Sequence, residues 1–274
     1  MATSEVLTVE KNGSVATLWL DNPERRNAMG PPFWADLPMI MEELSDDESV
    51  RVVVIAAKGP HFTTGLDLRT MALTSGGGGG ERQSQAARAA SARRQIKRMQ
   101  GTISSVADCP KPVIAAIHGA CIGGGVDLIT ACDIRLASSD AFFSVRETKI
   151  AIVADVGTLQ RLPRILSRGH VAELAYTGKD IDAARAAQIG LVNEVLSDVD
   201  ELHRAAQTMA EEIAANSPLV VMGTKAVLTA GADRSVEEGL DYVAIWNAAF
   251  LASDDLNEAM SAFVEKRPPL YTGR

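Results

Sequence analysis

The sequence of 274 residues is poor in the residues that build disulfide frameworks and metal centres. Its three cysteines, Cys109, Cys121 and Cys132, are too few and too irregularly spaced for a set of disulfides or for zinc ligation. The four histidines, at positions 61, 118, 170 and 203, are equally scattered. We therefore predict no metal site, and we expect unpaired thiols in a reducing, cytoplasmic compartment.

Basic residues and long apolar runs are also scarce. The 27 Lys and Arg residues are outnumbered by 35 Asp and Glu residues, which gives a net charge of −8. This balance disfavours nucleic-acid partners and anionic membrane surfaces. No apolar run approaches the roughly 20 residues that a membrane-spanning helix needs. We expect no secretory signal, and the C-terminal Thr272-Gly273-Arg274 is not a Ser-Lys-Leu peroxisomal signal.

Signatures of several enzyme classes are missing. No Gly-x-Ser-x-Gly turn is present to expose a serine nucleophile, and no Gly-x-Gly-x-x-Gly follows a strand as in nicotinamide sites. Cys121 lies close to His118, but a small buried cysteine at a strand end explains it better than a thiol nucleophile does. We therefore expect neither a nucleophilic serine or cysteine nor a bound cofactor.

Alternating strand and helix patterns predict an α/β fold. Asn12-Gly13 is typical of a hairpin turn between two strands. After these strands, apolar residues recur at helical spacing and would form one face of a helix: Leu37, Ile40, Met41 and Leu44. Strands are predicted over 6–10, 15–20, 51–57, 113–117, 133–137 and 141–145.

The last quarter of the chain is predicted to be helical. Leu202, Ala206, Met209 and Ile213 repeat at helical spacing. Ser217-Pro218 indicates the start of a second helix, running to about 229. Residues 235–238 form a capping box that begins a third helix, and a fourth is predicted from about 254 to the prolines at 268–269.

The chemistry is concentrated between residues 118 and 163. A predicted buried strand, 113–117, leads into the turn Gly123-Gly124-Gly125 and then into a helix. A strand, a glycine turn and a helix start leave main-chain N–H groups free to stabilise a developing negative charge. Asp127, Glu147 and Asp155 follow in an otherwise apolar region. Main-chain N–H groups that stabilise negative charge, together with acids that can move protons, suit proton transfer next to a carbonyl.

These residues resemble the crotonase (enoyl-CoA hydratase/isomerase) superfamily. The segments 123–128, 142–147 and 154–163 are most similar to those of Δ3,5-Δ2,4-dienoyl-CoA isomerases, and the wider resemblance runs from about Val6 to Pro269. It implies a ββα spiral core, residues 1–200, that carries an acyl-CoA thioester site. It also implies a C-terminal helical trimerisation region, residues 201–274, in a homotrimer or a hexamer made of two trimers. Coenzyme A would be part of the substrate.

The resemblance also implies roles for the site residues. The N–H groups of Leu66 and Gly124 would form an oxyanion hole for the thioester oxygen, where losing one donor costs roughly 2.7–4 kcal/mol of barrier. Isomerisation moves a proton between C2 and C6, four bonds apart, so two carboxyl groups are needed. We expect Asp155 to take the C2 proton and Glu147 to deliver one to C6, with Asp127 supporting both.

Hydration of 2-enoyl-CoA is the alternative activity. Hydratases of this superfamily carry Glu at the position of Asp127 and Gly at the position of Asp155. Glycine cannot transfer protons, and a carboxylate in its place also takes space from the attacking water. Isomerisation is therefore favoured over hydration.

Each acid also has a purely structural interpretation. Asp127 could cap or complement its own helix, and Asp155 could cap the helix that begins near Gly157. Glu147 could be a surface acid balanced by its basic neighbours. We expect a functional role because all three acids fall within one family pattern.

For the coenzyme A moiety, the resemblance implies a second group of residues. Arg69 replaces the lysine of related enzymes, and a guanidinium can also pair with phosphate. Phe263 and Lys266, near the C-terminus, would reach the substrate of a neighbouring subunit. The whole set comprises Arg26, Asn27, Ala28, Thr64, Gly65, Leu68, Arg69, Gly123, Phe263 and Lys266.

Two neighbouring segments have open interpretations. The glycine run at 76–80 is typical of a flexible loop tip. Residues 82–98 carry five Arg and Lys97 without an acid, which predicts a helix with a basic face. A solvated surface is the first interpretation, and contacts to the phosphates of coenzyme A are the second. Nucleic-acid binding is disfavoured because no aromatic residues interleave for base stacking.

Overall fold

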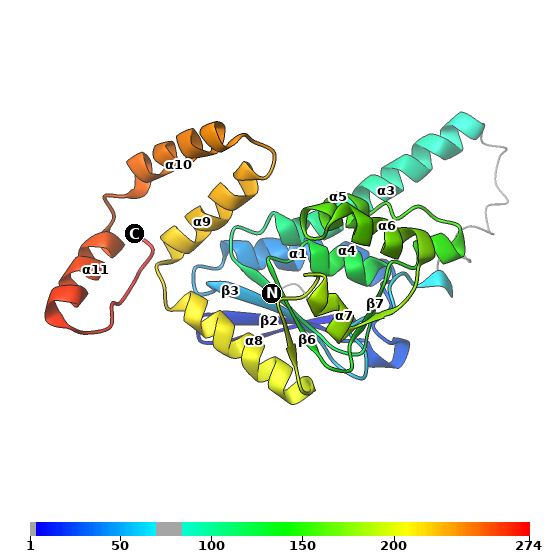
Figure 1. The fold of residues 1–274 in the computed structure, drawn as a ribbon, viewed down its shortest axis with the longest axis horizontal. Helices are drawn as coiled ribbons and strands as arrows, with labels where there is room; N and C mark the ends of the chain where they lie inside the picture. Colours follow the sequence, from blue (N-terminus) through cyan, green and yellow to red (C-terminus); the bar gives the residue numbers. More distant parts are fainter. Residues whose placement is uncertain (1–3, 70–83) are drawn as a thin grey trace.

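The computed structural model describes residues 4–69 and 84–274 (Figure 1). The glycine run at 76–80 and Arg82 lie outside the described residues. A six-stranded sheet forms the centre, with the order β1-β2-β3-β4-β6-β9. Its first pair is antiparallel and the other pairs are parallel. These strands are β1 (Leu7–Asn12), β2 (Val15–Leu20), β3 (Val52–Ala57), β4 (Val113–Ile117), β6 (Ile134–Ser138) and β9 (Glu194–Leu196).

A second, three-stranded sheet lies next to the site. It consists of β5 (Ala120–Ile122), β7 (Phe142–Ser144) and β8 (Ile181–Asp182). All six predicted strands are confirmed: 15–20 and 113–117 match at both ends, and the other four differ by one or two residues at an end. Strands β5, β8 and β9 were not predicted, because runs of two or three residues are too short to show periodicity.

Helices cover both faces of the central sheet, so its middle strands are apolar throughout. All residues of β3 and β4 are buried. On one face Val53 and Ile55 pack towards α1 (Pro31–Asp46), and on the other Val52 and Val54 pack against α8 (Val199–Ala214). The alternation follows from the two-residue period of a strand. The predicted helical faces of α1 and α8 are confirmed by this burial.

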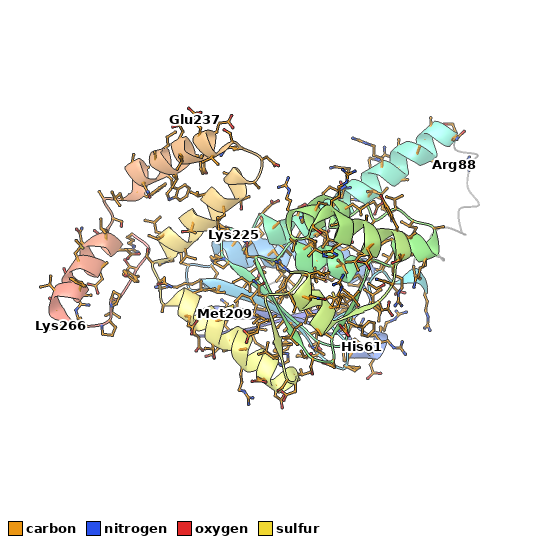
Figure 2. The ribbon with its side chains drawn as sticks, viewed as in Figure 1. His61, Arg88, Met209, Lys225, Glu237 and Lys266 are labelled. Atoms are coloured by element: carbon orange, nitrogen blue, oxygen red, sulfur yellow. The ribbon has the colours of Figure 1, made fainter. Side chains whose placement is uncertain are left out.

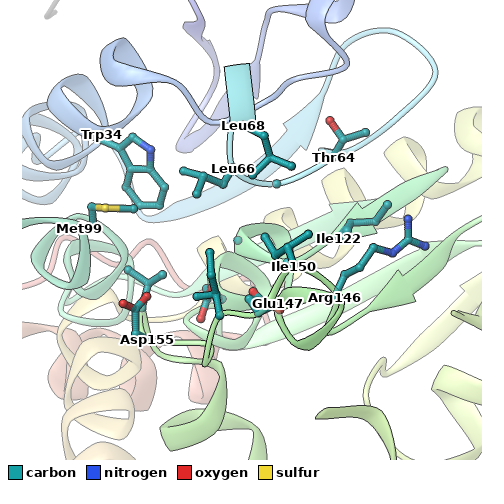
Figure 3. A pocket seen from close by; sticks show the side chains of 16 residues that line it. Trp34, Thr64, Leu66, Leu68, Met99, Ile122, Arg146, Glu147, Ile150 and Asp155 are labelled. Atoms are coloured by element: carbon teal, nitrogen blue, oxygen red, sulfur yellow. The ribbon is translucent and has the colours of Figure 1, made fainter. Parts of the chain in front are cut away.

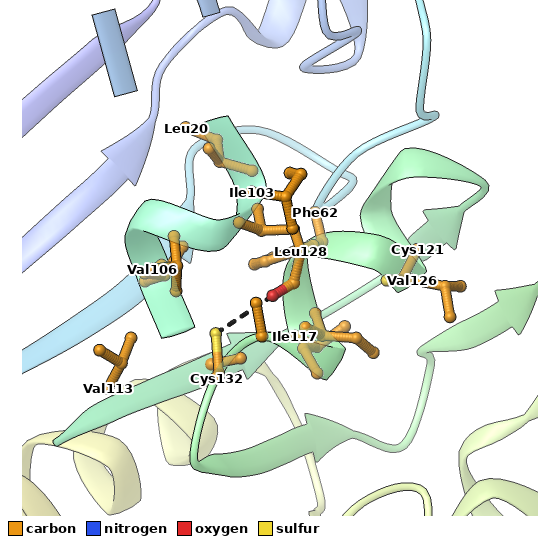
Figure 4. Packing of buried hydrophobic residues seen from close by; sticks show 14 of the residues in the cluster. Leu20, Phe62, Ile103, Val106, Val113, Ile117, Cys121, Val126, Leu128 and Cys132 are labelled. Carbon is orange, nitrogen blue, oxygen red and sulfur yellow. Dashed lines mark hydrogen bonds between the residues drawn. The ribbon is translucent and has the colours of Figure 1, made fainter. Parts of the chain in front are cut away.

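The core beneath the site contains the ends of two helices (Figure 4). Ile103 and Val106 of α3 (Gln85–Ala107) pack there with Leu128 of α4 (Gly124–Thr130). Cys121 is free and fully buried, and burial raises the pKa of its thiol well above the usual value. A protonated, inaccessible thiol suits packing, in line with the interpretation of Cys121 from the sequence.

The C-terminal helices extend away from the central sheet (Figure 1). The predicted capping box is confirmed: Ser235 and Glu238 bond reciprocally at the start of α10. No residue of α10 is buried, and α11 leaves Phe263 83% exposed. The division of the chain at residue 200 stays a prediction. The helices are α9 (Pro218–Gly231), α10 (Val236–Phe250) and α11 (Asp254–Glu265).

Short elements connect the strands and helices around the site. They are η1 (Pro23–Arg25), η2 (Glu147–Ile150), α5 (Thr158–Arg161), η3 (Leu162–Arg164), α6 (Arg168–Thr177) and α7 (Ala183–Gln188).

Within 4–69 and 84–274, no single helix is long and apolar enough to cross a membrane. Helices α8 and α9 reach that length and hydropathy only when they are taken together, and the pair is bent by 104°.

Candidate active site

A cavity of about 130 Å³ opens between the glycine turn, α1, α3 and the segment from 146 to 156 (Figure 3). It gathers the three predicted acids, the two predicted oxyanion donors and a set of apolar side chains. The apolar set was not predicted, because its members come from separate elements and share no motif. These apolar lining residues are Trp34, Met99, Ile122, Ile150, Ile152 and Val156.

Two main-chain segments meet at the glycine turn. Thr63 and Cys121 form a parallel bridge that fixes the two segments side by side. A Cβ on Gly65 would lie 3.3 Å from the nitrogen of Gly124, and one on Gly124 would lie 3.9 Å from the nitrogen of Leu66. Neither the Leu66 N–H nor the Gly124 N–H has an acceptor among the described residues. Both donors are therefore available to a ligand oxygen.

Replacing Gly65 with alanine is expected to lower kcat/KM by at least about 10²-fold, because it displaces one of the two donors. Gly65 has a φ of +79°, and its Cβ would lie 2.5 Å from the carbonyl oxygen of Ile122. Steady-state kinetics measures the effect. Gly169→Ala is the control, since nothing lies within 4 Å of its Cβ position. Full activity of the Gly65 variant would contradict the assignment of the Leu66 donor.

Asp127 is fully buried at the centre of the acid cluster. Its Oδ1 accepts the Thr158 N–H at 2.6 Å, so it caps α5 and not its own helix. Its Oδ2 is buried without a partner among the described residues. Burial raises the pKa of Asp127, while the bonds from Thr158 and the charge of Arg161 oppose that rise.

Glu147 begins η2 and points into the cavity. Its Oε1 would lie 3.3 Å from a Cβ on Gly123, beside the glycine turn, and its Oε2 is buried without a partner among the described residues. Arg146 pairs with Asp180 instead, so the interpretation as a balanced surface acid is wrong. Burial raises the pKa of Glu147 to about 7, with further contributions from the other two acids.

Asp155 lies in the same cavity, near Met99 (Figure 3). It does not cap α5, because the N-cap residue is Gly157 and the first N–H of the helix donates to Asp127. Its main-chain carbonyl accepts Nε2 of Gln100 at 2.6 Å. Burial raises the pKa of the Asp155 carboxyl. Since all three acids have raised pKa values, the cluster favours retaining a proton near neutral pH.

The predicted coenzyme A residues separate into two groups. The loop from 26 to 28 lies beside Thr64, whose N–H donates to the carbonyl of Arg26 at 3.2 Å. Asn27 is buried, and its amide donates to the carbonyls of Lys58 and His61. Its side chain therefore holds the loop in place and is not free to bind a ligand.

The remaining predicted coenzyme A residues include some at the cavity and some outside it. Leu68 lines it and Arg69 follows, exposed. Phe263 lies in α11 and Lys266 follows it, and neither residue lines the cavity. Helix α11 lies away from the central sheet (Figure 1), and Lys266 is labelled at its end in Figure 2. A role for these two residues would require a neighbouring subunit, as the sequence resemblance implied.

Comparison with known proteins gives the family. A model of the enoyl-CoA hydratase/isomerase family matches residues 10–274. The chain belongs to this family. It is 46% identical to a peroxisomal Δ(3,5)-Δ(2,4)-dienoyl-CoA isomerase of Arabidopsis thaliana over 98% of this chain and 96% of that protein. It is 48% identical to a mitochondrial isomerase of the same name from Dictyostelium discoideum, over 97% and 90% of the two chains.

Solved structures in the family have the same fold. The crystal structure of an enoyl-CoA hydratase from Bacillus anthracis has a TM-score of 0.89 at 31% identity, covering 98% of this chain and 100% of that one. The predicted family, α/β fold class and isomerase assignment are confirmed by these comparisons. The predicted cytoplasmic location is wrong, because the similar isomerases are named peroxisomal or mitochondrial.

Proposed function

We propose that this acyl-CoA isomerase converts 3,5-dienoyl-CoA to 2,4-dienoyl-CoA by carboxylate proton transfer. The observation that carries the proposal is the presence of Asp155 in one cavity with Glu147 and two main-chain N–H groups that have no acceptor within residues 4–69 and 84–274. The relatives named Δ(3,5)-Δ(2,4)-dienoyl-CoA isomerase support the same substrate class. Fatty-acid degradation is the setting in which such esters arise.

The thioester oxygen would accept the N–H groups of Leu66 and Gly124. Loss of a C2 proton creates an enolate conjugated with both double bonds of the acyl chain, and its negative charge lies largely on that oxygen. Two fixed donors stabilise this charge more than they stabilise the neutral ester, and this difference lowers the barrier. The apolar lining would hold the acyl chain and exclude water from this enolate.

Glu147 acts at C2 in this proposal, and Asp155 acts at C6. C2 is bonded to the thioester carbon, and Glu147 lies beside the glycine turn that would bind its oxygen. Asp155 lies next to Met99, where the acyl chain would continue. A pKa of about 7 suits a general base near neutral pH. This order reverses our sequence-based expectation, because a sequence does not show which end of the cavity each carboxyl group occupies.

The electrons and protons balance without any added reagent. Glu147 takes the C2 proton, and the electrons of that C–H bond form the C2=C3 bond. The C3=C4 bond shifts to C4=C5, the C5=C6 double bond opens, and its electron pair takes the proton of Asp155 at C6. Passage of a proton from Glu147 to Asp155 restores the starting state. Asp127 would keep α5 in place and, as a nearby negative charge, would help raise the pKa of Glu147.

The experiment that tests this function is a comparison of esters in deuterated water. We expect a 3,5-dienoyl-CoA to form the 2,4-diene, with deuterium at C6 detected by NMR, because carboxyl protons exchange with solvent. Hydration of a 2-enoyl-CoA should be at least about 10²-fold slower, since Asp155 occupies the space of the attacking water. Rapid hydration without isomerisation would instead establish the hydratase alternative.

Assembly into a homotrimer or a dimer of trimers is part of the proposal. The helices α10 and α11 leave apolar side chains largely exposed, which favours burial against neighbouring subunits. In such an assembly Phe263 and Lys266 would approach the coenzyme A moiety bound to a neighbour. Arg26, Ala28, Thr64 and Leu68 would contact the moiety bound to their own chain.

A further inference from the structure

Arg161 joins the loop that carries Asp155 to helix α3, although no step of the proposed reaction uses it. Its Nη2 donates to Oγ of Ser104 on α3 at 2.9 Å. Its Nη1 lies 3.5 Å from the carbonyl oxygen of Val156, the residue that follows Asp155. One guanidinium group therefore bridges the acid-bearing loop and a helix that is anchored in the core.

The loop is shaped around this guanidinium. Gly157 has a φ of +141°, and a Cβ there would lie only 1.9 Å from Nη1 of Arg161. The arginine thus occupies the space that a side chain at position 157 would fill. Only glycine accommodates both this φ and the close approach, so the turn after Asp155 depends on the arginine beneath it.

A second contact from α3 holds the preceding peptide. Gln100 donates to the carbonyl oxygen of Asp155 at 2.6 Å. Two successive carbonyls, those of residues 155 and 156, are therefore each tied to α3, one directly and one through Arg161. Such restraint keeps a carboxyl group in the geometry that proton transfer requires.

The position of Arg161 also affects the pKa of Asp127, the acid that accompanies Glu147 and Asp155. Arg161 ends α5, whose first residue, Thr158, donates its N–H to Asp127. Burial raises the pKa of Asp127, and the arginine charge opposes that rise and so favours the ionised form of the acid. An ionised Asp127 in turn raises the pKa of Glu147.

We propose that Arg161 is a positioning residue that fixes the Asp155 carboxyl relative to the reacting carbon by tying residues 156–157 to Ser104 of α3. This inference rests on the proposed isomerase function, since it concerns the loop of that reaction's second proton-transfer group. It assigns Arg161 a role through Asp155 and not through contact with the substrate.

The test uses variants of the whole 274-residue chain, assayed with a 3,5-dienoyl-CoA. Arg161→Met keeps the apolar stem but removes the bridge, and kcat should fall by about 10- to 100-fold with KM changed less than about threefold. Arg161→Lys should recover part of kcat, and Ser104→Ala should lower it by about two- to fivefold. Arg164→Met is the matched control, because Arg164 pairs with Asp233 at the exposed surface.

The pH profile of kcat/KM separates positioning from a general loss of folding. Without the arginine charge, Asp127 protonates more readily and Glu147 loses a negative neighbour, so the midpoint should move to lower pH in Arg161→Met. The thermal unfolding temperature and the folded fraction are measured for every variant, and rates are expressed per folded site.

The outcomes are distinguishable. Wild-type protein without activity on the 3,5-dienoyl-CoA would refute the proposed function itself. An active wild type with an unchanged kcat and pH midpoint in Arg161→Met would overturn the positioning role alone. A loss of activity that only follows the loss of folded protein, with the pH midpoint unmoved, would also overturn it.

Discussion

Replacing Asp155 with asparagine is expected to lower kcat for isomerisation of a 3,5-dienoyl-CoA by about 10²–10⁴-fold, the usual contribution of one proton-transfer group. Asparagine has nearly the same shape but carries no transferable proton near neutral pH. The main-chain bond from Gln100 to residue 155 does not involve the carboxyl group and should remain. Affinity for the ester, measured by calorimetry, should therefore change by less than about threefold.

Exchange at C2 makes this variant informative about the order of the two acids. Because Glu147 is intact, Asp155→Asn should still exchange C2 protons with deuterated water, although it no longer delivers a proton to C6. Asp233→Asn, at the exposed surface, serves as the control. Loss of C2 exchange in Asp155→Asn would reverse the assigned roles, and undiminished turnover would remove Asp155 from the mechanism.

Replacing Glu147 with glutamine is expected to abolish C2 exchange and to lower kcat by a similar factor, because glutamine cannot accept the proton. The loss should occur in the first step, so no deuterium enters the recovered substrate. NMR of that substrate after incubation measures this directly. Retained C2 exchange would show that another group is the base.

The Glu147→Gln variant should have a larger free energy of unfolding than the wild type at alkaline pH. The pKa of Glu147 is raised to about 7 from 4.5, so the folded state binds its proton more tightly than the unfolded state does. Ionisation thus destabilises the fold progressively between pH 4.5 and 7, and fully above 7. At about 1.4 kcal/mol for each pKa unit, the gain at pH 8 is up to about 3 kcal/mol.

Urea unfolding at several pH values measures this gain. The difference between Glu147→Gln and wild type should be largest near pH 8 and should disappear near pH 4. Glu237→Gln, on the exposed side of α10, is the matched control and should follow the wild type. A variant that is less stable than wild type at pH 8 would contradict the raised pKa. The buried acid cluster would thus lower the free energy of unfolding while it provides the groups for proton transfer.

Local features of the chain could be predicted well. The Asn12-Gly13 hairpin depends on a positive φ that glycine adopts freely, and the capping box at 235–238 depends on bonds across three residues. The buried faces of α1 and α8 follow from helical periodicity. Each of these is set by neighbours in the sequence, so a pattern of residue types is sufficient to identify it.

The contents of the site were predictable only in part. The glycine turn and the three acids lie in one stretch of the chain and could be named together. The apolar lining from Trp34 and Met99 could not, because amphipathic helices bury many such residues without forming a site. Asn27 was assigned to substrate binding from its motif, yet its amide is occupied by two main-chain carbonyls.

The sequence by itself therefore determined the longer strands, the amphipathic helices, the glycine turn and the three acids that line the cavity. Tertiary structure alone decided that Glu147 lies beside the glycine turn, and that Arg161 and Gln100 contact the loop of Asp155. The Gln100 bond joins groups 55 residues apart. Contacts of that kind depend on how the elements pack, and no local pattern of residues encodes the distance between two packed elements.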